Sequence, residues 1–242
     1  MKKLRRIADA VAVAALLTAL CAFAFAEPKE GKPPPVKQRR YVVAAMGDSL
    51  TDPRSFGGKY LDVLRRRCPG SRFDSYGVGG QMVNQMRRRF ARDVLGQPPD
   101  EDNPKPSYTH VIVLGGLNDI LSDESASRTN DKIVKDLQAM FKLAQDGGLE
   151  VVAVTLPPWA GFERYHNRRR QASTLLINRW LRRQAGKGGR VDRVLDAYPL
   201  LSCGQPAFLC QPYALKDQVH WSKQGHEVIG QALHRQIFSD CR

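Results

Sequence analysis

The chain has 242 residues, of which 42% are hydrophobic, and it carries a formal net charge of +14 and five cysteines. This length is sufficient for one domain with a full hydrophobic core. The cysteines form no Cys-x-x-Cys pair, which argues against a zinc knuckle and against a dithiol redox site. The basic residues are not interleaved with aromatic ones, so no platform for nucleic acid is indicated and no nucleic-acid partner is expected.

The first 26 residues have the pattern of an export signal. A basic start at 1–6 precedes an apolar run from Ala10 to Ala26, which ends in Ala24-Phe25-Ala26. Small residues in this spacing are typical of a signal-peptide cleavage site, and we expect cleavage before Glu27. An uncleaved membrane anchor is the alternative, because the apolar run is just long enough to span a bilayer. The sequence therefore predicts an exported protein, periplasmic or extracellular.

Residues 27–40 are basic and rich in proline and lack apolar periodicity, which predicts a flexible linker before a domain at 41–242. The leader carries four basic residues and one acidic residue, so its removal lowers the net charge from +14 to +11. A basic exported domain favours peripheral contact with anionic envelope surfaces. A solvated cationic exterior is the simpler explanation of the same charge.

Apolar runs alternate with amphipathic segments from Tyr41 onward. The expected strands are 41–46, 72–76, 110–114, 150–156 and 191–195. Three of them are almost entirely apolar, which is typical of parallel strands covered on both faces. Apolar residues at helical spacing lie at 133–144, closed by Gly147-Gly148, at Leu175, Leu176, Trp180 and Leu181, and at 228–237. The alternation predicts an α/β fold, a three-layer α/β/α sandwich with a parallel sheet of about five strands.

Four cysteines remain after the leader, at Cys68, Cys203, Cys210 and Cys241. They permit three pairings, and an oxidising compartment favours disulfides over free thiols. A bond between Cys203 and Cys210 closes a short loop, and Cys68 then joins Cys241. The sequence leaves the choice among the pairings open.

Segments with reactive or hydrogen-bonding groups follow the expected strands. They are Gly47-Asp48-Ser49-Leu50, Gly77-Val78-Gly79-Gly80, Gly115-Gly116-Leu117-Asn118-Asp119 and, before the last helix, Asp217-Gln218-Val219-His220. The carboxyl ends of parallel strands share one edge of the sheet, where ligands of open α/β sheets bind. We therefore expect all four segments to meet at that edge.

Ser49, His220 and Asp217 are the residue types of an acyl-transfer site. A serine hydroxyl is a poor nucleophile and needs a neighbouring base. The imidazole of His220 can take the proton from Ser49 and return it to the leaving alcohol, while Asp217 orients the ring. Each residue alone has a structural explanation, such as a helix N-cap for Ser49. Their occurrence together, each in the right place in the topology, favours catalysis.

The four blocks resemble those of the GDSL, or SGNH, hydrolase superfamily, over roughly residues 41–238. The resemblance implies a flavodoxin-like sheet and ester hydrolysis through a covalent acyl-enzyme. It also implies an oxyanion hole made of the backbone N–H groups of Ser49 and Gly80 and the side-chain amide of Asn118. No cofactor or metal is expected: Asp217, His220 and His226 can be drawn as metal ligands, but the catalytic roles already explain two of them.

The substrate is indicated by residues that belong to none of the four blocks. Trp159 and Phe162 follow the fourth strand at the same edge, where they either contact an acyl chain or a sugar ring or pack beneath their loop. Export, charge and aromatic residues favour a short acyl group on a carbohydrate or cell-wall polymer. A lysophospholipid or other lipid ester is the alternative within the family, and a non-catalytic envelope-binding module is the alternative of another class. The oligomeric state is not predicted.

Overall fold

The computed structural model of the protein describes residues 38–102, 104–186 and 188–242. Within this range five strands form a sheet with the order β2-β1-β3-β4-β5, and every pairing is parallel. The strands are β1 (Val42–Gly47), β2 (Arg72–Gly77), β3 (His110–Leu114), β4 (Glu150–Val154) and β5 (Arg193–Leu195). The expected leader, and the expected linker up to residue 37, lie outside the described residues.

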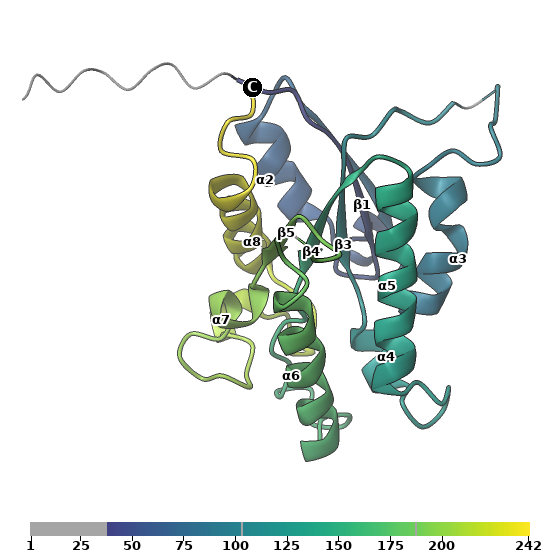
Figure 1. The fold of residues 1–242 in the computed structure, drawn as a ribbon. Helices are drawn as coiled ribbons and strands as arrows, with labels where there is room; N and C mark the ends of the chain where they lie inside the picture. The colour runs from purple at the N-terminus through teal and green to yellow at the C-terminus, as the bar shows by residue number, and fades with distance from the viewer. Residues whose placement is uncertain (1–37, 103, 187) are drawn as a thin grey trace, which may run out of the picture. The chain divides into compact units, whose positions relative to one another are not determined.

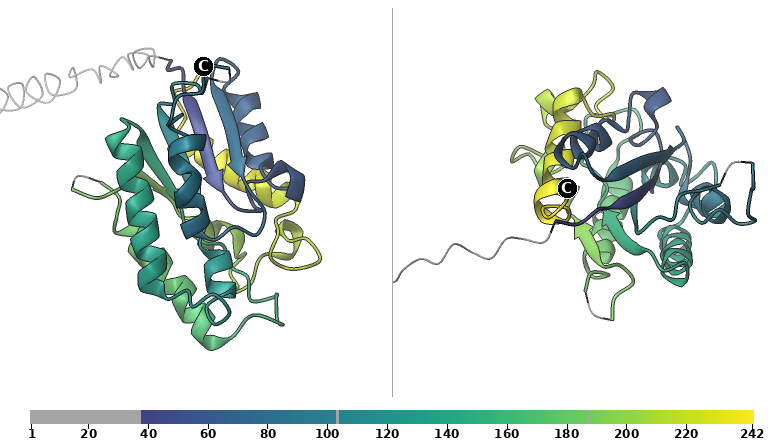
Figure 2. Two further views of the ribbon diagram at one scale, coloured as in Figure 1. Left: turned by 90° about the vertical axis from the view of Figure 1, so that its right-hand side faces the viewer. Right: turned by 90° about the horizontal axis from the view of Figure 1, so that it is seen from above.

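Helices cover both faces of the sheet (Figures 1 and 2). One face carries α2 (Lys59–Arg67), α7 (Ala197–Leu201) and α8 (Lys223–Gln236), and the other carries α3 (Val83–Asp93), α4 (Leu117–Leu121), α5 (Asn130–Asp146) and α6 (Arg168–Arg182). Two 3₁₀ turns, η2 (Pro53–Ser55) and η3 (Gln211–Tyr213), lie in loops. The predicted three-layer α/β/α fold is confirmed. None of the helices in the described residues combines the length and apolarity needed to cross a bilayer.

Neighbouring residues of the central strands pack into opposite layers. In β1, Ala44 and Met46 join the core beneath α3 and α5, whereas Val43 and Ala45 join the core beneath α2 and α8. A strand that is buried on both faces has no solvent side, which is why β1, β3 and β4 are continuous apolar runs. The expected and observed bounds differ by at most two residues at either end of a strand.

The buried face of α6 differs from the predicted one. Leu175 and Leu176 are 39% and 45% exposed, whereas the polar Thr174 and Asn178 are completely buried. The Asn178 side chain accepts a hydrogen bond from the N–H of Leu156 at 2.7 Å and donates one to its carbonyl at 2.9 Å. A buried amide that is paired on both sides carries little desolvation penalty, so α6 can turn this polar face inward. The helix thereby holds the start of the loop that follows β4.

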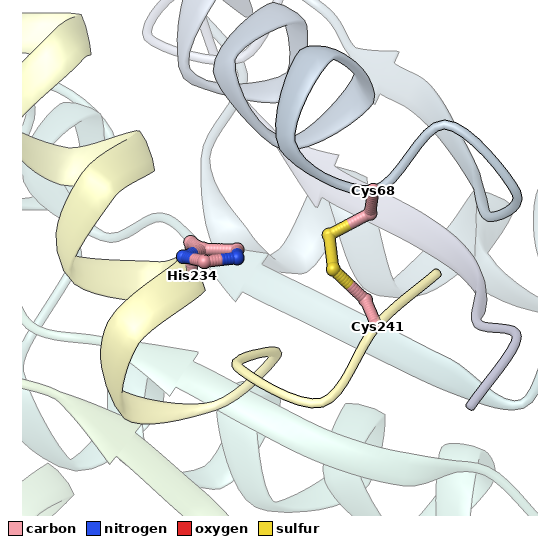
Figure 3. A group of neighbouring side chains, drawn as sticks. All are labelled: Cys68, His234 and Cys241. Carbon is pink, nitrogen blue, oxygen red and sulfur yellow. A yellow bond between two sulfur atoms is a disulfide. The ribbon is translucent and has the colours of Figure 1, made fainter. Parts of the chain in front are cut away.

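Two disulfides join Cys68 to Cys241 and Cys203 to Cys210. The first links the end of α2 to the C-terminal segment, 173 residues further along the chain (Figure 3). A crosslink over so long a segment restricts the unfolded chain strongly. Backbone bonds add to it, because the N–H of Arg39 donates to the carbonyl of Asp240 at 2.8 Å. Both ends of the described chain are thus fastened at the amino edge of the sheet.

Candidate active site

Ser49 lies in the turn that follows β1. The strand that comes next in the chain, β2, pairs with one side of β1, and the strand after that, β3, pairs with the other side, so the strand order changes direction at β1. Such a change of direction leaves a crevice at the carboxyl edge of a parallel sheet. The turn is tight, because the N–H groups of Thr51 and Asp52 both donate to the carbonyl of Asp48, at 3.0 and 2.9 Å. A β-carbon at Gly47 would lie 2.3 Å from Thr51 Oγ1, so only glycine fits at the end of the strand.

A hydroxyl, an imidazole and a carboxylate are in contact at this crevice. His220 Nε2 lies 2.8 Å from Ser49 Oγ, and His220 Nδ1 lies 2.6 Å from Asp217 Oδ2. The other carboxylate oxygen, Asp217 Oδ1, accepts the backbone N–H groups of Val219 and His220 at 3.0 and 2.9 Å. The structure therefore brings together the three residues that were expected to act together.

These contacts define the direction of the hydrogen bonds. Partial burial works against ionisation of Asp217, but hydrogen bonds from the His220 side chain and from the two backbone N–H groups outweigh it, so the pKa of this carboxyl lies below its ordinary value. An ionised Asp217 accepts the proton on Nδ1 of His220. Nε2 is then the nitrogen that accepts a hydrogen bond from the Ser49 hydroxyl.

Gly80 and Asn118 line the same cavity as Ser49. Gly80 follows β2 with a φ of 75°, and the place that its β-carbon would occupy is open space. Asn118 lies in the first turn of α4, and its Nδ2 donates to the carbonyl of Gln81 at 3.0 Å and to Asp48 Oδ2 at 3.4 Å. The chain thus presents a backbone group and a side-chain amide around the space in front of Ser49.

Asp48 is a buried residue of the site that the sequence reasoning did not single out. Its side chain is buried, with Oδ1 accepting the N–H of Leu50 at 3.0 Å and Oδ2 facing the Asn118 amide. Burial raises the pKa of Asp48 to about 6, against the opposing effects of the Leu50 hydrogen bond and of His220. The only signal was its place beside Ser49 in the first block. Asp48 lies between the turn that carries Ser49 and the helix that carries Asn118, and its contact with Asn118 is long.

A second buried carboxylate holds the helices around the cavity. Asp119 accepts the N–H of Val83, the first residue of α3, at 2.8 Å and pairs with Arg128 at 2.7 Å. Arg128 also pairs with Asp136 of α5, at 2.7 Å. Burial raises the pKa of Asp119, against the hydrogen bonds from Val83 and Arg128. This network joins α3, α4 and α5 at the edge where the cavity opens.

The cavity at Ser49 has a volume of about 540 Å³. Its apolar lining comes from the side chains Phe56, Leu117, Leu121, Phe162, Leu215 and Val219. Phe56 is 71% exposed and has a φ of 61°, a strained value for a residue with a side chain. Backbone strain of this kind gathers at ligand sites, and here it places an aromatic ring at the cavity.

Of the two aromatic residues expected at the substrate, Phe162 lines the cavity and Trp159 does not. This corrects the expectation for Trp159, whose side chain is completely buried. The loop after β4 folds back over α6, and the indole N–H of Trp159 donates to Thr174 Oγ1 at 3.0 Å. A buried indole needs such a partner, so Trp159 packs beneath the loop and supports it.

The described residues contain one group of His, Cys, Asp or Glu side chains close enough to hold a metal ion, namely Cys68, His234 and Cys241 (Figure 3). The two sulfur atoms are bonded to each other, so they offer no thiolate ligands. His226 stacks on Tyr60, at 6.1 Å between ring centroids. Its burial, aided by Lys59, lowers the pKa of His226 to about 3, so the ring is neutral.

Comparisons with known proteins give the family of the chain and agree with its fold. The family model of the GDSL-like lipase/acylhydrolase family matches residues 45–228. The fold is similar to that of a GDSL-like lipase from Bacteroides thetaiotaomicron (TM-score 0.62, 20% identity, 82% of this chain and 88% of that chain covered). It is also similar to an acetylxylan esterase from Geobacillus stearothermophilus, solved as a catalytic mutant (TM-score 0.65, 18% identity, 85% and 98% covered). A lipase/acylhydrolase from Enterococcus faecalis is a third similar structure (TM-score 0.62, 18% identity, 84% and 98% covered). No curated protein sequence matches the chain.

Proposed function

Because the chain belongs to the GDSL-like lipase/acylhydrolase family and is an ester hydrolase, we propose that Ser49, His220 and Asp217 hydrolyse a carboxylic ester through an acyl-enzyme. The observation that carries the proposal is the pair of short contacts that His220 makes, 2.8 Å to Ser49 Oγ and 2.6 Å to Asp217 Oδ2. Membership of an enzyme family argues against the alternative of a non-catalytic envelope-binding module.

In the first half of the reaction, Ser49 Oγ attacks the ester carbonyl carbon while Nε2 of His220 takes the hydroxyl proton. The ionised Asp217 stabilises the imidazolium that forms. Collapse of the tetrahedral intermediate breaks the bond to the alcohol oxygen, which receives the proton from Nε2. In the second half, His220 activates a water molecule in the same way, and attack on the acyl-enzyme releases the acid and frees Ser49.

We assign the stabilisation of the negative oxygen to the N–H groups of Ser49 and Gly80 and to the Asn118 amide. The carbonyl of Gln81 holds one N–H of Asn118 at 3.0 Å, whereas the contact with Asp48 is long, at 3.4 Å. The second N–H is therefore weakly engaged and free to turn to the oxyanion. Catalytic hydrogen bonds are often long before substrate binds, and one such donor contributes about 3 kcal/mol in the transition state.

For the substrate we propose a short acyl group on a carbohydrate or cell-wall polymer. Phe56, 71% exposed, offers a ring face at the cavity, and the acetylxylan esterase is one of the structural neighbours. A lysophospholipid or other lipid ester is the second candidate. It is favoured by the apolar lining that Leu117, Leu121, Phe162 and Leu215 provide.

We also propose that the protein is exported. The leader pattern in residues 1–26 supports this, and so do the two disulfides of the described chain, because such bonds persist in oxidising compartments. The net charge of +11 after cleavage supports peripheral attraction to anionic envelope surfaces.

The test is an acyl-length series of p-nitrophenyl esters, from acetate to palmitate, with the chain from residue 27 onward. We expect kcat/KM to be highest for acetate and Ser49→Ala to lower kcat at least about 1000-fold. Ser239→Ala, which removes an exposed hydroxyl at the opposite edge of the sheet, is the matched control. A maximum at long chains would transfer the assignment to a lipid ester, and an active Ser49→Ala would refute the proposed nucleophile.

A further inference from the structure

A second cavity, of about 330 Å³, lies between the loop closed by the Cys203–Cys210 disulfide and the side chain of Gln218. Gln218 stands in the chain between Asp217 and Val219, and both of these residues line the cavity at Ser49. The two cavities therefore flank a single turn of the chain. A ligand group held in the second cavity therefore lies beside the segment that carries Asp217.

The second cavity has an unusual combination of lining groups. Phe208 is 46% exposed, which is high for a large apolar side chain, and it lines the cavity together with the half-buried Gln218 and the exposed Gln205 and Gln211. No Asp, Glu, Lys or Arg is among its lining residues in the described chain. The side-chain amides of Gln205 and Gln211 make no hydrogen bond to other described residues, and that of Gln218 makes only a long one, 3.4 Å to the carbonyl of Leu215.

These groups define the ligand by its chemistry. A glutamine amide both donates and accepts hydrogen bonds, which matches a hydroxyl group, and the ring of Phe208 offers an apolar face. The lining provides no charge for an ionic ligand to pair with. An acyl chain would fill the space but would offer no hydrogen-bond partner to the glutamine amides. A flat, neutral molecule with many hydroxyl groups and one apolar face satisfies all of these groups, and a sugar ring is such a molecule.

The loop that carries Phe208 is held in place. The disulfide closes it, and the carbonyl of Ala207 accepts the N–H groups of both Trp159 and Ala160, at 3.1 and 2.8 Å. A β-carbon at Gly161 would lie 2.7 Å from the Gln218 Cβ, so the loop after β4 packs closely on the Gln218 side chain as well. A site that is already ordered binds its ligand with less loss of conformational entropy.

We propose that this second cavity is a subsite for a sugar ring of a carbohydrate ester, with Phe208 as the stacking residue and the glutamines as partners of the hydroxyl groups. The inference rests on the proposed function, because it gives the alcohol side of the ester its place. It makes an oligosaccharide ester a better substrate than an ester of a small alcohol.

The experiment compares O-acetylated xylotetraose and O-acetylated cellotetraose with p-nitrophenyl acetate. The quantity of interest is kcat/KM for the oligosaccharide ester divided by kcat/KM for p-nitrophenyl acetate. We expect Phe208→Ala to lower this ratio about tenfold, mainly by raising KM for the oligosaccharide ester. Phe208→Trp, which keeps an aromatic face, should retain the ratio. Leu176→Ala removes a side chain of similar exposure, 45%, from α6 and is the matched control that leaves both rates unchanged. Thermal unfolding of each variant monitors the fold.

The outcomes separate the two claims. If the protein hydrolyses p-nitrophenyl acetate but neither oligosaccharide ester, or if Phe208→Ala leaves the ratio unchanged, the sugar subsite is refuted while the esterase assignment stands. If no ester is hydrolysed, or if Ser49→Ala remains active, the proposed function itself fails. A tenfold fall in the ratio for Phe208→Ala, together with an unchanged ratio for Phe208→Trp, supports the subsite.

Discussion

The two edges of the sheet each place a hydroxyl, an imidazole and a carboxylate in contact. At the carboxyl edge these groups belong to Ser49, His220 and Asp217, and at the amino edge they belong to Thr109, His110 and Glu150. His110 Nδ1 lies 2.9 Å from Thr109 Oγ1, and its Nε2 lies 3.2 Å from Glu150 Oε2. The same three chemical groups thus occur twice in one domain.

The surroundings of the hydroxyl distinguish the two edges. Thr109 Oγ1 accepts the N–H of Val42 at 3.2 Å and donates to the Val42 carbonyl at 3.1 Å, so its proton and one of its lone pairs are engaged by the backbone. Ser49 Oγ instead faces a cavity that Gly80 and Asn118 also line. Three groups in contact are insufficient for acyl transfer, because the developing oxyanion needs donors and the hydroxyl must be free to attack.

The two histidines differ in the same way. His110 is 6% exposed, and burial, with the nearby Arg39, lowers its pKa despite the attraction of Glu150. Its ring lies edge-on to Tyr41 and Phe238, at centroid distances of 5.0 and 5.9 Å. His110 is therefore a buried, neutral ring at the amino edge, whereas His220 lines the cavity at Ser49.

Exchange of each histidine for glutamine is the strongest test of this comparison. We expect His220→Gln to lower kcat on p-nitrophenyl acetate at least about 1000-fold, because the base for Ser49 is lost. His110→Gln should leave kcat within about twofold at a temperature where the variant is folded. Steady-state kinetics, with circular dichroism as the folding control, measure both. Equal losses from the two substitutions would contradict the distinction between the edges.

The next effect concerns the Asn118 amide at the carboxyl edge, which lines the cavity at Ser49. Asn118→Ala should lower kcat on p-nitrophenyl acetate about 100-fold with a much smaller change in KM, because the amide acts mainly on the transition state. A loss confined to KM would mean that Asn118 binds the ground state instead. Asn130→Ala, at the start of α5 and away from the cavity lining, is the control.

The last effect is on stability rather than on turnover, and it comes from Asp48. Burial raises its folded pKa to about 6, above the usual unfolded value of about 3.9, so the folded protein binds more protons between these pH values. The stability that Asp48 contributes is complete at low pH and is lost as the pH rises through about 6. Asp48→Asn removes this titration. As the pH rises from 4 to 8, the unfolding free energy of the variant should therefore increase relative to that of the wild type by up to about 3 kcal/mol.

Urea denaturation of both proteins at several pH values measures that gain. Glu150→Gln at the amino edge is the comparison, because it makes the same kind of exchange at a carboxyl whose side chain is half exposed. A difference between Asp48→Asn and the wild type that stays constant with pH would show that Asp48 is not held protonated by burial.

The sequence predicted the sheet and the place of the site because the signals there are local. Buried parallel strands are apolar throughout, and the stripe of α5 from Ile133 to Ala144 follows the helical period. The contact between Ser49 and His220 spans 171 residues, yet both follow from the rule that loops at the carboxyl edge converge.

The remaining features depend on polar groups whose partners are distant in the chain. Periodicity assigned Leu175 and Leu176 to the core, whereas Asn178 is buried because it pairs with the backbone of Leu156, 22 residues earlier. Trp159 is buried for the same kind of reason, since its partner Thr174 lies 15 residues further along. Residue patterns record how apolar a position is but not which polar partner it will meet.

The short disulfide has a consequence for how the protein responds to thiols. Cys203 and Cys210 are only seven residues apart, so their bond restricts the unfolded chain less than the bond between Cys68 and Cys241 does. Its main effect is local, since it shapes the loop whose Ala207 carbonyl supports Trp159 and Ala160. A mild reductant that opens this bond alone is therefore expected to disturb the proposed sugar subsite while the longer disulfide still holds the two ends of the domain together.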